Sequence, residues 1–68
     1  MENEEKAKLR TMLHYWIEHN KEHGQEFREW GDRAMVSGEI QAGEEMMAAT
    51  KEMDKANEFL SRARKRLE

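Results

Sequence analysis

Three histidines lie close together in this 68-residue chain, at His14, His19 and His23. Residues four apart share one face of a helix, so His19 and His23 can present two imidazoles to a single metal ion. Glu26 follows on the same edge and can add a carboxylate oxygen, with Glu22 as an alternative. The spacing predicts a candidate metal site of His19, His23 and Glu26 for zinc, nickel, cobalt or iron.

A structural role for the same region is the competing interpretation. Asn20 and His23 interrupt an otherwise apolar heptad pattern, and polar residues at such positions often fix the register of packed helices at some cost in stability. Under this interpretation, Asn20 and His23 form a polar layer, and His19 merely flanks it. Under the metal interpretation, a dimer would double the ligand set.

Other chemistries have little support in the sequence. Cysteine is absent, which removes disulfides and thiolate ligands. Neither serine has the sequence context of an activated nucleophile, and the net charge of −3 with no basic face argues against nucleic-acid binding. We therefore expect no catalytic residues, no enzyme activity and no cofactor, unless the histidines bind nickel or zinc.

The first long element is expected over about residues 4–36. Its apolar seam advances by alternating steps of four and three residues, the pattern of a helix that packs along one stripe. Gly24 marks a possible break, but the seam stays in phase across it. The seam contains Leu9, Leu13, Trp16, Asn20, His23, Phe27, Trp30 and Ala34.

A turn at residues 37–38 and a second helix over about residues 39–66 complete the expected fold. Gly38 suits the left-handed residue that ends a helix. Pairing the two seams through this turn predicts an all-α antiparallel two-helix hairpin that spans residues 1–68 as a single domain. In this hairpin, two residues that face each other across the helices have numbers that add to about 76. The second seam contains Ala42, Met46, Ala49, Met53, Ala56, Leu60, Ala63 and Leu67.

One contact between two helices is a small core for a chain of this length. Several apolar side chains also remain outside the expected seams: Ile17, Val36, Ile40, Met47 and Phe59. We therefore expect a homodimer that forms a four-helix bundle. No apolar run is long enough to span a bilayer, and the acidic first five residues differ from a signal peptide, so we expect a cytoplasmic protein with no membrane role.

The segment from Leu13 to Trp30, with the motif Trp16-Ile17-Glu18-His19-Asn20 followed by His23 and Phe27, resembles a small helical prokaryotic domain of unknown function. The resemblance includes residues 53–57. Such domains occur alone or attached to proteins that handle metals such as nickel, so the resemblance implies a link to metals but supplies no catalytic residue.

Two functional hypotheses follow. The first is a non-enzymatic helical interaction or assembly module, working as a homodimer or with another protein partner, in which Asn20 and His23 set the register. The second is a nickel- or zinc-binding accessory or sensor protein that uses His19, His23 and Glu26.

Overall fold

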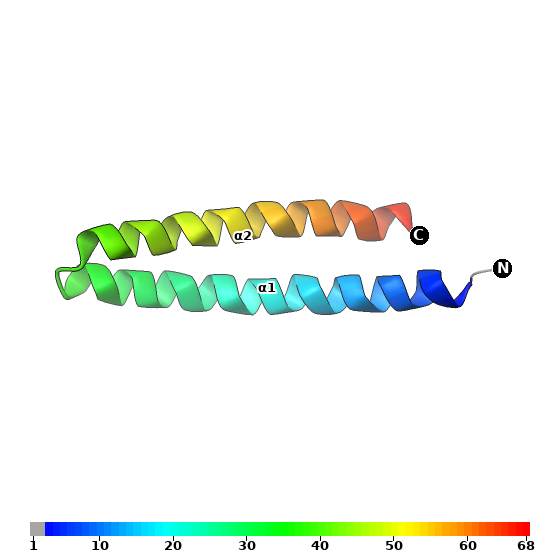
Figure 1. The fold of residues 1–68 in the computed structure, drawn as a ribbon, viewed down its shortest axis with the longest axis horizontal. Coiled ribbons are helices and arrows are strands. Elements are labelled where there is room, and N and C mark those ends of the chain that lie inside the picture. The colour runs from blue at the N-terminus through cyan, green and yellow to red at the C-terminus, as the bar shows by residue number, and fades with distance from the viewer. Residues whose placement is uncertain (1–2) are drawn as a thin grey trace.

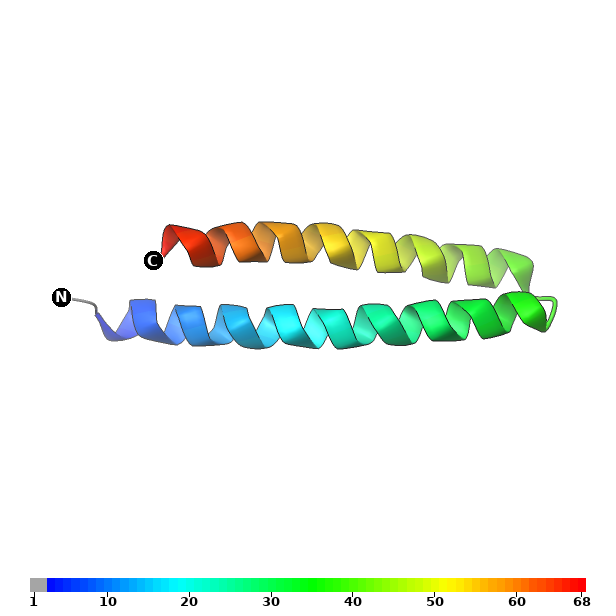
Figure 2. The same cartoon turned by 180° about the vertical axis from the view of Figure 1, so that it is seen from behind.

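The computed structural model describes residues 3–68, so Met1 and Glu2 of the acidic N-terminal segment lie outside the described residues. Helix α1 runs over Glu4–Val36 and helix α2 over Ile40–Arg66. The helices lie side by side and antiparallel, with both chain ends at the end remote from the turn (Figures 1 and 2). The helical hairpin expected from the sequence is confirmed.

Local capping explains where α1 begins and ends. The Asn3 side chain accepts a 2.7 Å hydrogen bond from the Lys6 amide, satisfying a free N–H of the first turn. At the other end, the Ser37 amide donates to the Arg33 carbonyl, and Gly38 has a φ of 97°, the left-handed conformation that favours glycine. Between these caps α1 is continuous, so Gly24 does not break it.

Near the turn, the two helices approach through glycine. Gly31 and Gly43 are both buried, and a Cβ atom added at Gly43 would lie 2.8 Å from the Gly31 carbonyl oxygen. No side chain fits between backbones at that distance. The absence of side chains at these positions therefore sets the close approach of α1 and α2.

Further from the turn, the contact uses larger side chains. Leu13 and Ile17 are the only buried apolar side chains within residues 3–68, each 4% exposed. Thr50 is also buried, and its hydroxyl donates to the carbonyls of Gly24 and Met46 at 3.3 and 3.1 Å. The fully enclosed core of the single chain is therefore very small.

Half of each expected seam, including Leu13 and Met46, lies in or beside the contact, whereas the other half is rotated out of it. The level of pairing is close to expectation. In α1, Trp16 and Trp30 are exposed, while Ile17 and Gly31 are buried. In α2, all four seam alanines are exposed, while the residues that follow two of them, Gly43 and Thr50, are buried. Small residues explain the difference, because glycine and threonine let the backbones come closer than tryptophan would allow.

Within the described part of the chain, neither helix is long and apolar enough to cross a membrane.

Candidate functional site

The rotation of the helices leaves a large apolar surface, here called the apolar face, on one side of the hairpin. Helical geometry places on this side the residues of the expected seams that the intrachain contact does not enclose. Trp16 and Trp30 remain 40% and 57% exposed. The apolar face comprises Leu9, Met12, Trp16, Phe27, Trp30, Ala34, Ala42, Met46, Ala49, Met53, Ala56, Leu60, Ala63 and Leu67.

Two shallow grooves show that the helices contribute jointly to this face. At the open end, Leu9, Met12 and Trp16 of α1 line a groove together with Leu67, which follows α2. Near the turn, a second groove is lined by α1 and α2 residues that include Trp30, Ala34, Ala42 and Met46. Both helices thus contribute to the apolar face at each end of the hairpin.

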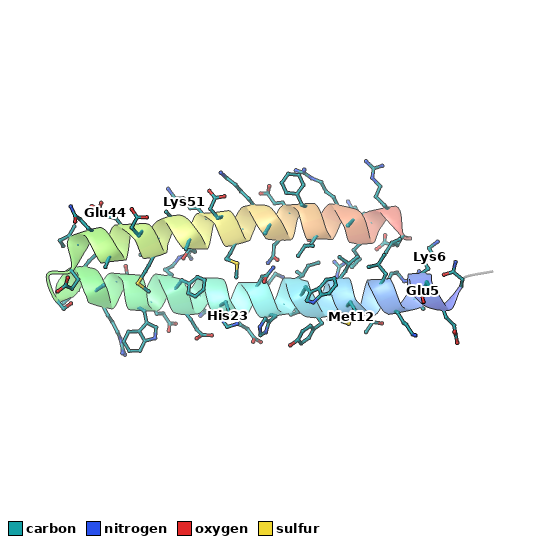
Figure 3. The ribbon with its side chains drawn as sticks, in the orientation of Figure 1. Glu5, Lys6, Met12, His23, Glu44 and Lys51 are labelled. Atoms are coloured by element: carbon teal, nitrogen blue, oxygen red, sulfur yellow. The ribbon has the colours of Figure 1, made fainter. Side chains whose placement is uncertain are left out.

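Most of the remaining surface is charged, although the side chains of Tyr15, Val36, Ile40 and Phe59 are also exposed there. Figure 3 shows Glu44 and Lys51 on the side of α2 that is turned away from α1. A groove on the side opposite the apolar face is lined mainly by charged side chains, including Lys21, Arg28 and Asp54. The hairpin is therefore amphipathic as a whole, and the apolar face is its chemically distinct side.

A polar contact crosses between the helices near the middle of the hairpin. The Asn20 amide donates to the Asn57 side-chain oxygen at 3.0 Å, and the Asn57 amide donates to the Ile17 carbonyl at 3.1 Å. Asn20 therefore lies in the contact, with Asn57 as its partner. Sequence reasoning missed Asn57, although it stands seven residues after Thr50 and so shares its side of α2.

His23 lies instead in a ladder of rings on α1, spaced four residues apart. Tyr15 stacks on His19 with ring centroids 5.4 Å apart, His19 meets His23 edge-on at 4.3 Å, and His23 stacks on Phe27 at 6.0 Å. The Nε2 atoms of His19 and His23 are 2.9 Å apart, so one ring donates its N–H to the lone pair of the other. His14 is separate from this pair and lies 3.4 Å from an Arg64 guanidinium nitrogen.

Glu26 lies beside the far nitrogen of His23. Its carboxylate is 3.6 Å from His23 Nδ1, whereas His19 faces Nε2. Glu26 therefore occupies the position that an outer partner of a metal-bound histidine takes, beside the ring nitrogen that does not face the second histidine. Among residues 3–68, no three or more His, Asp or Glu side chains converge as a metal-binding group. The structure brings together His19 and His23 and places Glu26 behind them.

A family model described as "Domain of unknown function (DUF8180)" matches residues 9–67. The chain belongs to this family. The DUF8180 match covers most of both helices, including the apolar face, the Asn20–Asn57 contact and the histidine pair. It confirms the resemblance to a helical domain of unknown function. The comparisons with curated proteins and with solved structures found no match.

Proposed function

We propose that this DUF8180 hairpin is a non-enzymatic assembly module that forms a homodimeric four-helix bundle through the apolar face. The observation that carries the proposal is the exposure of Trp16 and Trp30 on the same side of the hairpin. Contiguous exposed apolar surface rimmed by charge is typical of protein interaction sites. A second copy would remove this surface from water.

The size of the core supports the same proposal. Ordering a residue costs about 1.5 kcal/mol in conformational entropy, and burial of apolar surface must offset that cost. Within residues 3–68, the only buried large apolar side chains are those of Leu13 and Ile17. Burying the apolar face of each copy against the other supplies the missing burial, since both inner surfaces become core.

Folding that is coupled to association depends on protein concentration. We expect the urea midpoint of unfolding, followed by circular dichroism, to rise as the chain concentration is raised from 1 to about 100 μM, because mass action favours the dimer. A midpoint that stays constant over this range would contradict the proposal.

A second candidate function, transition-metal binding, is supported by the histidine pair. Two bonds of about 2.05 Å at a right angle place their nitrogen atoms about 2.9 Å apart, and square-planar or octahedral ions coordinate at that angle. This is the separation of the two Nε2 atoms. The pair is therefore close enough to bind one nickel or zinc ion, with Glu26 orienting His23 and water or a second copy completing the shell.

Metal binding by this pair has a matched control within the chain. We expect nickel to raise the free energy of unfolding by about 2.7 kcal/mol at a concentration 100 times its Kd, as linkage requires. The effect should disappear in His19→Ala and His23→Ala but persist in His14→Ala, because His14 lies apart from the pair. Calorimetric titration with thermal unfolding measures both quantities. Equal binding by all three variants would exclude the pair as the site.

A further inference from the structure

The apolar face is built from two stripes that differ in size. The bulky stripe on α1 consists of Leu9, Trp16 and Trp30, with the polar residue His23 at the same heptad position, and the alanine stripe on α2 consists of Ala42, Ala49, Ala56 and Ala63. The other residues of the apolar face lie between these two stripes or beside them. Both stripes repeat every seven residues, so each keeps to one side of its helix. One half of the face is therefore raised and the other half recessed.

The levels of the two stripes alternate along the hairpin. Two residues that face each other across the hairpin, one on each helix, have numbers that add to about 74–77, as the contacts Asn20–Asn57 and Gly24–Thr50 show. Each residue adds about 1.5 Å along its helix. Trp16 is therefore level with the gap between Ala56 and Ala63, and Trp30 with the gap between Ala42 and Ala49. Successive alanines are about 10.5 Å apart, so each gap forms a hole bounded by two alanines and by the side chains between them, Phe59 and Leu60 in one and Glu45 and Met46 in the other.

Two kinds of two-fold axis can place one apolar face on another. An axis parallel to the helices puts both turns at the same end and packs α1 of each copy on α2 of the other. Residues that face each other within one copy then also face each other between the copies. An axis across the helices puts the turns at opposite ends, with α1 on α1 and α2 on α2. That second arrangement sets tryptophan stripes against each other and leaves voids between alanine stripes, contrary to the dense packing of protein interiors.

Given the homodimer proposed above, we infer that the two copies pack with their turns at the same end, the bulky stripe of each seated on the alanine stripe of the other. Trp16 then enters the gap between Ala56 and Ala63 of the second copy, and Trp30 the gap between Ala42 and Ala49. Knobs of one helix entering holes of another is the packing of helical bundles. The same sequence thus specifies both the partner and its orientation.

Spin labels distinguish the two arrangements. The chain has no cysteine, so Val36→Cys beside the turn and Lys8→Cys near the open end each create one labelling site, and both positions are exposed. For turns at the same end, we expect Val36 labels in a dimer to lie within about 30 Å of each other, since neighbouring helix axes are about 10 Å apart. In mixed dimers of the Val36 and Lys8 variants, the distance between the two labels should then be about 40 Å or more, because residues 8–36 of α1 span that length along the helix axis.

The opposite pattern would overturn the inferred orientation. In that case Val36 labels would be about 45 Å apart and the mixed pair close together, because α1 would lie antiparallel on its own copy. Such a result leaves the homodimer intact. A labelled protein that sediments as a monomer at 100 μM, without any intermolecular distance, would instead overturn the dimer itself and with it the orientation.

Discussion

Ala49→Glu is expected to raise the dissociation constant of the dimer at least 100-fold, equivalent to about 2.8 kcal/mol. Ala49 lies in the middle of the alanine stripe, so the substitution places a carboxylate in the proposed interface. Burial of an unpaired charge costs several kcal/mol even after relaxation. Two-fold symmetry introduces the change twice in each dimer, which adds to the effect.

Ala48→Glu is the matched control. Ala48 is also exposed, but it lies one residue earlier, about 100° around α2, on the side directed away from α1. The same change in charge and helix propensity there should leave the dissociation constant within about twofold, as is usual for surface substitutions. Sedimentation of both variants over a concentration series measures the difference. Equal weakening by both would place the interface elsewhere.

Gly43→Ala is expected to lower the free energy of unfolding by about 1–3 kcal/mol, the usual cost of overpacking. The new methyl group would lie 2.8 Å from the Gly31 carbonyl oxygen and within 2.5 Å of the Met35 side chain. Met35 can move, but the Gly31 backbone can yield only if the helices separate. Thermal unfolding should show a decrease of about 4–8 °C in Tm for each kcal/mol lost.

Gly24→Ala provides the comparison within the same contact. A Cβ atom at Gly24 would lie 3.8 Å from the Met53 Cβ, an ordinary van der Waals distance. We therefore expect the variant to gain about 0.5–1 kcal/mol, because alanine favours the helical conformation over glycine. A Gly43→Ala variant as stable as Gly24→Ala would contradict the proposed role of Gly43 in the close approach of the helices.

The hairpin was predictable because its signals are local and agree with one another. Proline is absent, the only convincing turn falls at Ser37 and Gly38, and the heptad spacing persists on both sides. The turn also determines the level of pairing, since a short connection leaves little freedom along the helix axes. The Asn20–Asn57 contact lies within one residue of the expected level.

The rotation of the helices was not predictable from hydrophobicity, because two stripes of heptad spacing lie side by side on each helix. Apolar size favours the stripe with Trp16 and Trp30, whereas the intrachain contact uses Ile17, Gly24 and Gly31. Helix propensity makes glycine a weak point of a helix, whereas Gly24 and Gly31 are sites of close packing in this structure. The spacing of seven residues between Gly24 and Gly31, repeated by Gly43 and Thr50, was the available signal.

The candidate sites also differ in whether they depend on local spacing or on the rotation of the helices. The spacing of His19 and His23 predicts a shared metal site, which stays a prediction. Their rings do lie together, because a helix brings residues four apart side by side whatever its rotation. The partner of Asn20 depends on rotation and could not be derived in the same way. Asn57, which the expected seam left outside, accepts the hydrogen bond that Ala56 could not.

The proposed self-association is tested most directly by sedimentation equilibrium of the unmodified chain. At 100 μM, the account predicts a mass of about twice the 8.1 kDa of one chain, with dissociation on dilution, as mass action requires. A folded helical species that remains at 8.1 kDa over the whole concentration range would contradict it. The apolar face would then have to be the binding surface for a different protein.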